Sequence, residues 1–263
     1  MTGASNILNI VLIGAGNVAN SIGPALQTVQ QFKIVQVWSK TKTSAELLAN
    51  KLNCDYTTNI GQINKNADVY IYMLKDSVLG KIIDMLKLPD TALHIHTGGS
   101  IGLEVFDKSK PHCGVMYPFQ TFSRQRQISV EQVPIFVEGK TTSDCEKIKY
   151  IASQISSQVY DFNTEHRKWL HIAGVFANNF SNVMLGIAAE MAQQAGLSQE
   201  VLLPLMHETV NKLHTMTAKE AQTGPAVRGD KEVMRQHIDA IDNPQYKELY
   251  IQLSDIILQR SKH

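Results

Sequence analysis

The chain has 263 residues, 43% of them hydrophobic, and a formal net charge of +1. A chain of this length can bury a full core. Its balanced charge gives no reason to expect a nucleic acid or a membrane surface as partner, which leaves a small-molecule substrate. The three cysteines lie far apart without metal-ligand spacing, so neither a disulfide framework nor a metal site is predicted, and a cytoplasmic location is favoured.

The N-terminal sequence lacks the basic start of a signal peptide, and no segment has an uninterrupted apolar run of about 18 residues. We therefore expect a protein that is neither secreted nor membrane-spanning. Up to residue 163, short apolar runs alternate with helical patterns, which is typical of a parallel, doubly wound α/β sheet. The runs expected to form strands are residues 7–13, 34–38, 67–74, 92–97, 113–117, 133–138 and 158–162.

The first of these runs leads directly into the sequence GAGNVA, which begins at Gly14 and is followed by a helical pattern. A glycine at position 14 permits a sharp turn, and one at Gly16 lets a pyrophosphate approach the free N–H groups of the helix N-terminus. The context of strand, turn and helix predicts dinucleotide binding by Gly14, Ala15, Gly16, Asn17 and Val18. The alternative is a glycine turn without a ligand.

The second strand predicts which dinucleotide is bound. In a NAD-specific fold this strand ends in Asp or Glu, which accepts hydrogen bonds from the ribose. Here it ends in Ser39, Lys40 and Thr41, whose hydroxyl and ammonium groups suit the 2′-phosphate of NADP(H). Alternatively, Lys40 and Lys42 belong to a solvated loop and Thr43 or Ser44 caps the next helix, in which case the choice between NAD and NADP stays open.

Two later strand ends belong to the same predicted edge of the sheet. Leu74 and Lys75 are expected to cover the nicotinamide end through their backbone, with Asp76 or Ser77 capping the following helix. The other strand ends in His96 and Thr97, which are expected to line the nicotinamide side. His96 is a candidate catalytic residue because histidine exchanges protons near neutral pH. The alternative for His96 is a hydrogen-bonded structural group.

After residue 163 the strand patterns stop, which predicts a helical domain over residues 164–263 beside a Rossmann domain over residues 1–163. A helix is expected from Thr164 to Gln194, with Gly196 at its C-terminal cap. Its apolar residues occur on all sides, as in a helix buried among others. Further helices are expected near residues 198–214, 230–239 and 244–259.

The long helix carries three polar residues, His171, Asn178 and Asn182, whose spacing places them on one face at 100° per residue. Buried polar groups need partners, so these three are candidates for substrate binding and, for His171 and Asn178, for catalysis. Other helices or a second subunit are the alternative partners. Farther along, Arg228 follows a Gly-Pro turn and could bind a substrate carboxylate, although a simple capped turn ending at Asp230 also explains this segment.

The segments GAGNVA, HTGGS, YPFQTF at residues 117–122, HIAGVFANNF and TGPAVRGD occur in this order along the chain. Together they resemble a family of Rossmann-like putative NADP oxidoreductases whose C-terminal half is domain of unknown function 2520. The resemblance implies an NADP-binding Rossmann domain and a helical domain similar to those of 6-phosphogluconate dehydrogenase, β-hydroxyacid dehydrogenases and pyrroline-5-carboxylate reductase. It also implies a homodimer that forms through the helical domain.

The chain departs from these relatives at two positions. The β-hydroxyacid dehydrogenases have a catalytic lysine four residues before an asparagine of the long helix, where this chain has Gly174, Val175 or Asn178. His171 could take the place of that lysine. The resembled family also has a histidine where this chain has Tyr117, which puts an essential histidine at that position in doubt.

These observations predict an NADP(H)-dependent oxidoreductase that acts on a small polar substrate, a carbonyl, imine or hydroxy acid, held between the nicotinamide and the long helix. His171 is expected to donate or orient the proton, and Asn178 to anchor the substrate. Because the catalytic lysine of the β-hydroxyacid dehydrogenases is missing, a nucleotide-binding sensor or regulatory dimer without turnover is the alternative.

Overall fold

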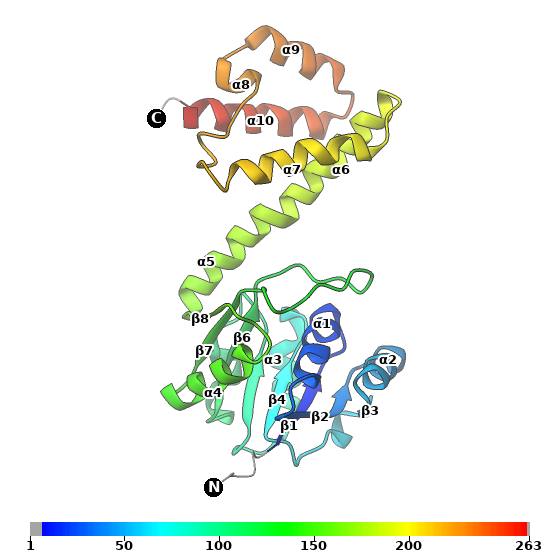
Figure 1. Cartoon of the computed structure of the whole chain (residues 1–263), viewed down its shortest axis with the longest axis vertical. Coiled ribbons are helices and arrows are strands. Elements are labelled where there is room, and N and C mark those ends of the chain that lie inside the picture. The colour runs from blue at the N-terminus through cyan, green and yellow to red at the C-terminus, as the bar shows by residue number, and fades with distance from the viewer. Residues whose placement is uncertain (1–6, 262–263) are drawn as a thin grey trace. The chain divides into compact units, whose positions relative to one another are not determined.

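The computed structural model describes residues 7–261, with the side chains of residues 107–109 left aside. By compactness the chain divides into two units, Met1–Asn178 and Asn179–His263. Figure 1 shows that the first unit contains the sheet and that the second consists of helices.

The sequence predicts a boundary between domains 1–163 and 164–263, at the start of helix α5 (Thr164–Gly174). Residues 1–6 and 262–263, at the outer ends of these two domains, lie outside the described part of the chain. By compactness α5 belongs with the sheet. The boundary after residue 163 therefore stays a prediction.

The first unit is built on an eight-stranded sheet of order β3-β2-β1-β4-β5-β6-β7-β8. Its first six strands follow the Rossmann order, and they are parallel to one another, so the predicted α/β fold is confirmed. The strands are β1 Leu8–Ile13, β2 Phe32–Trp38, β3 Asp55–Thr57, β4 Val69–Tyr72, β5 Leu93–His96, β6 Cys113–Pro118, β7 Ile135–Gly139 and β8 Val159–Asp161.

The sheet differs from the prediction in two places. Strand β3 was not expected, because its three residues, Asp55–Thr57, are too short and too polar to form an apolar run. Strand β7 runs antiparallel to β6, whereas the sequence predicts a parallel sheet throughout. The physical reason is the connection, because a parallel neighbour requires a crossover, usually a helix, and a plain loop joins these two strands.

Helices cover both faces of the sheet, which therefore has a hydrophobic core on each side (Figure 1). Alternate residues of β1 point to opposite cores, with Ile10 and Leu12 on one side and Val11 and Ile13 on the other. The helices of this unit are α1 Asn17–Gln27, α2 Lys42–Leu52, α3 Asp76–Met85, α4 Thr142–Ser153 and α5, with the 3₁₀ helices η1 Ile60–Gln62 and η2 Leu103–Ser109. Helices α1, α2 and α4 contribute to the first core, and α3 and η2 to the second.

The long helix predicted from Thr164 to Gln194 contains a π-helical segment, η3 (Val175–Phe180), between α5 and α6 (Ser181–Gln194). The C-cap of α6 is Ala195, and Gly196, the predicted cap, is the next residue, which ends the helix in the left-handed region with φ 76°. The remaining helices are η4 Gln199–Leu202, α7 Leu203–Lys212, α8 Pro225–Arg228, α9 Lys231–Ala240 and α10 Pro244–Ser261.

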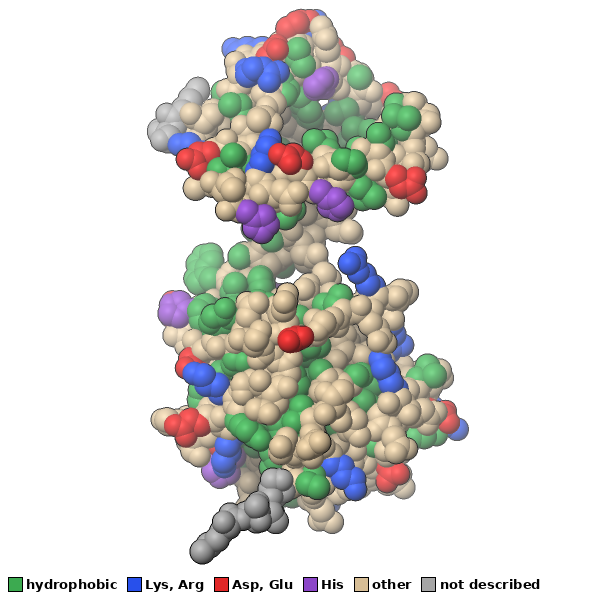
Figure 2. All heavy atoms as spheres, viewed as in Figure 1, with side chains coloured by type: hydrophobic (Ala, Val, Ile, Leu, Met, Phe, Trp, Pro, Cys, Tyr) green, Lys and Arg blue, Asp and Glu red, His purple; other side chains and the backbone are tan. Residues whose placement is uncertain are grey.

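The apolar side chains of the helical unit are not buried as the sequence predicts. Figure 2 shows hydrophobic side chains on the visible face of this unit. Exposed residues of α6 to α10 include Val183, Leu205, Val210, Leu213 and Ile256. By length and composition the segment Thr164–Gln194 could even cross a membrane. Its polar residues at positions 171, 178 and 182 instead suit a helix that packs against protein.

Candidate cofactor and active site

The glycine turn lies where β1 ends, next to β4, which is the point where the strand order of the sheet reverses. Ligands of open α/β sheets bind at such a switch point, beyond the carboxyl ends of the strands. Gly14 has φ +116°, and a Cβ built on it would lie 2.3 Å from the carbonyl oxygen of Met73. Only glycine can therefore fill this position, because the turn is tightly packed against the chain that leaves β4.

Gly16 is required for a different reason. A Cβ built on Gly16 would meet no atom of the described residues within 4 Å, and its φ of −80° suits any residue. Gly16 is also the N-cap of α1, and no side chain in the described chain caps this helix. The open space in front of a helix N-terminus with free N–H groups is suited to a pyrophosphate. The geometry thus fits the dinucleotide role predicted for residues 14–18.

The end of β2 is hydrogen-bonded to the glycine turn, since Gly14 N–H donates to Trp38 O at 2.8 Å. Thr41 is the N-cap of α2, so the alternative in which Thr43 or Ser44 caps this helix is wrong. Lys40 and Thr41 are exposed at the cap. No acid occurs in the first turn of α2, as far as the described residues show. An anion at this helix end would meet an ammonium group, hydroxyls and the positive end of a helix dipole.

The loops after β4 and β5 meet at the same edge. Lys75 is the N-cap of α3, so the expected capping by Asp76 or Ser77 is wrong. The carboxylate of Asp76 instead accepts a hydrogen bond from Ser100 Oγ at 2.6 Å. Thr97 is buried, and both its N–H and its hydroxyl donate to Tyr72 O. The two loops are thereby fixed next to the glycine turn.

His96 is fully buried, and its Nδ1 accepts a hydrogen bond from Gly98 N–H at 3.1 Å. Burial, reinforced by the charge of Arg167, lowers the pKa of His96 to about 3. A neutral, buried imidazole cannot easily exchange a proton with a substrate. The geometry therefore favours the structural alternative for His96, in which it holds the turn after β5.

The structure instead brings His171 together with Tyr117, near the end of strand β6. Tyr117 Oη and His171 Nδ1 lie 3.0 Å apart in a hydrogen bond whose direction depends on the imidazole tautomer. Both side chains are partly buried. A Cβ on Gly99 would lie 2.6 Å from each of them, so this glycine lets the pair rest against the loop after β5. The Tyr117–His171 pair is thus located at the edge where β1, β4 and β5 end.

The surroundings of Tyr117 keep its phenol protonated. Burial is the main cause that raises the pKa of Tyr117 to about 12, and the carboxylate of Asp76 adds to it. The charge of Arg167 acts in the opposite direction. A phenol in this state is a hydrogen-bond donor at neutral pH. Any phenolate formed there is partly stabilised by the nearby guanidinium.

Arg167 is a further residue of this region that the sequence analysis missed. Its side chain is fully buried in an ion pair with Glu138, and it also donates to Ile101 O at 2.5 Å and to Thr164 Oγ1 at 3.2 Å. These bonds fix α5, and with it His171, against β7 and the loop after β5. The only sequence signal for this role is an arginine inside the first turn of a helix, which is common on surfaces.

The remaining predicted site residues lie farther along the chain. Asn178, in η3, and Asn182, in α6, are exposed, and the 100° step assumed for their common face does not apply across a π-helical segment. Arg228 is exposed at the end of α8, while Asp230 caps α9 through Val233 N–H, as the alternative for this segment expects. Their substrate contacts stay predictions. Among the described residues, no group of three His, Cys, Asp or Glu could hold a metal ion.

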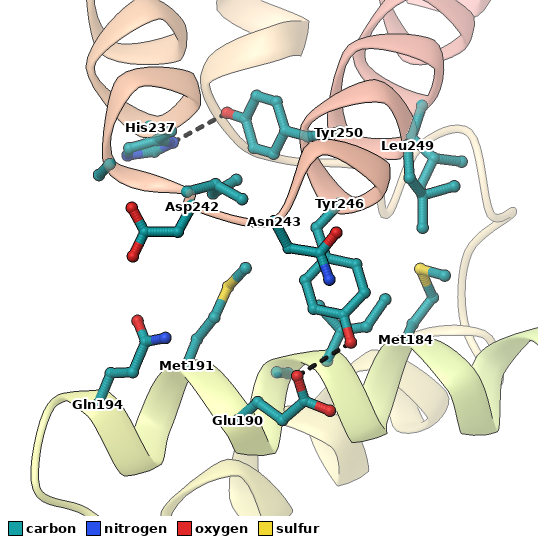
Figure 3. Close-up of a pocket in the computed structure, with 15 residues that line it drawn as sticks. Met184, Glu190, Met191, Gln194, His237, Asp242, Asn243, Tyr246, Leu249 and Tyr250 are labelled. Atoms are coloured by element: carbon teal, nitrogen blue, oxygen red, sulfur yellow. Dashed lines mark hydrogen bonds between the residues drawn. The ribbon is translucent and has the colours of Figure 1, made fainter.

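The helical unit has a cavity of its own, of about 640 Å³, between α6, α9 and α10 (Figure 3). Two hydrogen bonds join residues that line it: Tyr246 Oη of α10 donates to Glu190 of α6 at 2.9 Å, and Tyr250 Oη of α10 lies 2.8 Å from His237 Nδ1 of α9. The rest of the lining is mainly apolar, with Met184 and Met191 among its residues. None of the residues predicted for catalysis lines this cavity.

Comparison with known proteins shows which proteins the chain resembles. Residues 133–257 match a domain of unknown function, DUF2520. The solved structure of a putative NADP oxidoreductase from Bacteroides fragilis is 42% identical, with a TM-score of 0.90 over 97% of this chain and 100% of that one. A protein from Thermotoga maritima is 20% identical, with a TM-score of 0.77 over 97% and 100% of the two chains.

The fold also occurs in an enzyme of low sequence identity. A pyrroline carboxylate reductase from Plasmodium falciparum, solved with NADP bound, has a TM-score of 0.60 at 10% identity over 98% of each chain. No curated protein matches the chain. The Bacteroides fragilis structure confirms the resemblance inferred from the motifs, because it is 42% identical and the match covers 97% of this chain and 100% of that one. The chain therefore belongs to the same protein family as the Bacteroides fragilis putative NADP oxidoreductase, with a DUF2520 domain over residues 133–257.

Proposed function

We propose that the protein is an NADP(H)-dependent oxidoreductase that acts on a small polar substrate with a carbonyl, imine or hydroxy-acid group. The observation that carries this proposal is the Tyr117–His171 pair, which lies at the sheet edge that also holds the glycine turn. The name of the related Bacteroides fragilis protein and the NADP bound to the Plasmodium falciparum reductase support the cofactor.

The chain's own residues fit this dinucleotide at both of its phosphate groups. Gly14, Ala15, Gly16, Asn17 and Val18 form the uncapped start of α1, with open space above Gly16 for the pyrophosphate. A second anion site lies at the uncapped start of α2.

There, Ser39, Lys40 and Thr41 would hold the 2′-phosphate, which an aspartate or glutamate at this position would repel. Leu74 and Lys75 lie beside the glycine turn, where their backbone would cover the nicotinamide end.

When bound, NADPH supplies a hydride. The chain must then supply a proton, and Tyr117 is placed to do so. His171 Nδ1–H donates a hydrogen bond to Tyr117 Oη in one tautomer, which leaves the phenol hydrogen free for the substrate oxygen or nitrogen. As the proton leaves, the phenolate is stabilised by that hydrogen bond and by the charge of Arg167. In the reverse direction the same pair accepts the proton of a hydroxyl group.

The other predicted residues have supporting roles in this proposal. Thr97 and His96 shape the loop after β5 on the nicotinamide side. Asn178, Asn182 and Arg228 remain predicted substrate contacts, with Arg228 suited to a carboxylate.

We also propose that the protein is a cytoplasmic homodimer that forms through its helical unit. Exposed apolar residues on α6, α7 and α10 support the dimer, because patches of this kind on a soluble protein mark interaction surfaces. Light scattering during size-exclusion chromatography tests it: a dimer mass is expected, and a stable monomer at micromolar concentration would contradict it.

The catalytic proposal is tested by following the loss of NADPH absorbance with panels of carbonyl compounds, imines and β-hydroxy acids. Tyr117→Phe should lower kcat by about 100-fold or more, which is the usual contribution of a general acid. His166→Gln, an exposed histidine of the same helix, is the control and should be as active as wild type. Tight NADPH binding without turnover of any compound in the panel would contradict the proposal that the protein is an oxidoreductase.

A further inference from the structure

The segment between β6 and β7, residues 119–134, lies against the glycine turn (Figure 1). Asn17 Nδ2 donates to Phe122 O at 3.0 Å, which connects this segment to the first turn of α1. Phe122 and Ile128 pack against the first hydrophobic core. The segment is therefore anchored on both sides of Arg124, although that arginine itself is exposed.

Arg124 joins the two parts of the chain that are suited to phosphates. Its Nη2 donates to Ala15 O, in the glycine turn, at 2.7 Å and to Ser44 Oγ, in the first turn of α2, at 3.3 Å. These partners are separated from it by 109 and 80 residues of sequence. No local propensity explains such a position, so the fold of the β6–β7 segment must place the guanidinium there.

The hydrogen bonds of Arg124 leave donors for a ligand. Both described bonds use Nη2, and the guanidinium has five N–H donors in a planar fork that matches phosphate oxygens. Bonds to a charged acceptor are roughly twice as strong as bonds to a carbonyl oxygen. A phosphate at the start of α2 would therefore compete well with Ala15 O for this side chain.

We propose that Arg124 determines cofactor specificity by binding the 2′-phosphate of NADP(H) together with Ser39, Lys40 and Thr41. This inference rests on the proposed function, because it assumes that the glycine turn and the start of α2 bind that cofactor. It assigns the β6–β7 segment a role in recognising the dinucleotide.

The test uses two fragments of the cofactor, 2′,5′-ADP and 5′-AMP, which differ by the 2′-phosphate. Their affinities for the full-length protein are measured by titration calorimetry. Three proteins are compared, namely wild type, Arg124→Ala and Arg126→Ala. Arg126 is the matched control, because it is an exposed arginine of the same segment. Thermal unfolding of each protein confirms that the variants fold.

We expect Arg124→Ala to bind 2′,5′-ADP at least tenfold more weakly, about 1.4 kcal/mol, while its affinity for 5′-AMP changes less than twofold. Arg126→Ala should bind both fragments like wild type. If Arg124→Ala weakens both fragments equally, or neither, the inference is overturned. Failure of the proposed cofactor is a separate result, because wild type itself would then bind the two fragments with equal affinity.

Discussion

Gly14 and Gly16 differ in what a methyl group would meet, and this difference makes a prediction about each. At Gly16 the backbone is unstrained and, among the described residues, no atom lies within 4 Å of an added Cβ. Gly16→Ala should therefore fold. Alanine reduces the conformational entropy of the unfolded chain, which stabilises the folded variant by about 0.4–1 kcal/mol. Alanine is also a poorer N-cap residue than glycine, and this offsets the gain. We expect the free energy of unfolding to change by less than about 1 kcal/mol.

The same methyl group occupies the space that a pyrophosphate needs at the start of α1. If it displaces the phosphates from even one N–H group, a charge-assisted hydrogen bond worth about 1.5–3 kcal/mol is lost. The expected result is a Kd for NADPH that is about 10- to 150-fold higher than that of wild type. Calorimetric titration measures this Kd, and urea denaturation measures the unfolding free energy of the same preparation.

Gly14→Ala is the matched control, and it should lose folding stability, whereas Gly16→Ala should lose cofactor affinity. Its Cβ would lie 2.3 Å from Met73 O at φ +116°, so the turn itself must move. We expect this variant to be destabilised by several kcal/mol. If Gly16→Ala binds NADPH like wild type, or if it unfolds as Gly14→Ala does, the reasoning about the glycine turn is refuted.

Three further predictions concern the catalytic pair, the pH dependence of stability and the buried arginine. Once a substrate is found, Tyr117→Phe and His171→Gln should have non-additive effects on kcat/KM, because the two hydrogen-bonded side chains act as one unit. Additive effects in the double variant would show that the two side chains act independently. His94 is a fully buried residue of β5, and burial lowers its pKa to about 4, so the unfolded chain binds this proton more readily and stability should fall as pH drops from about 6.5 towards 4. Because His96, whose pKa is lowered to about 3, contributes to the same slope, the conservative variant His94→Gln should reduce the slope in urea unfolding by about half, and an unchanged slope would contradict a contribution from His94. Arg167→Met should destabilise the protein by about 3–5 kcal/mol, since it leaves the Glu138 carboxylate without its partner, and a loss below about 1 kcal/mol would contradict the ion-pair assignment.

The parts of the site that follow one another along the chain could be predicted from sequence. The turn GAGNVA combines a strand, two glycines and a helix within a few residues, and its geometry follows from local sterics. The acid-free end of β2 and the loops that follow β4 and β5 follow from the same pattern of alternating strands and helices, although β4 ends at Tyr72 and β5 at His96, before the predicted ends at residues 74 and 97. Because parallel strands end at one edge, their relative placement was also predictable.

The parts of the site that depend on distant contacts could not be predicted. Tyr117 and His171 are 54 residues apart, and only the packing of α5 against the sheet brings them together. Arg124 reaches the glycine turn across a loop that has no regular pattern. His96 shows the reverse case, since its position at a strand end was predicted but its complete burial depends on neighbours from other elements.

The helical unit shows a limit of a different kind. Its apolar pattern predicts burial, and periodicity alone does not say which surface covers an apolar side chain. The π-helical segment at Val175–Phe180 also has no signal in the hydrophobic pattern, because it changes the hydrogen bonding of the backbone while the composition stays apolar.

The central claim is that the end of β2 selects the 2′-phosphate of the cofactor. A comparison of NADPH and NADH affinities by tryptophan fluorescence tests it most directly. Trp38 lies beside Ser39, and a Trp169→Phe background removes the exposed second tryptophan, so the signal reports on the proposed phosphate site. We expect NADPH to bind at least tenfold more tightly than NADH, a difference of about 1.4 kcal/mol. Equal affinities for the two cofactors would contradict it.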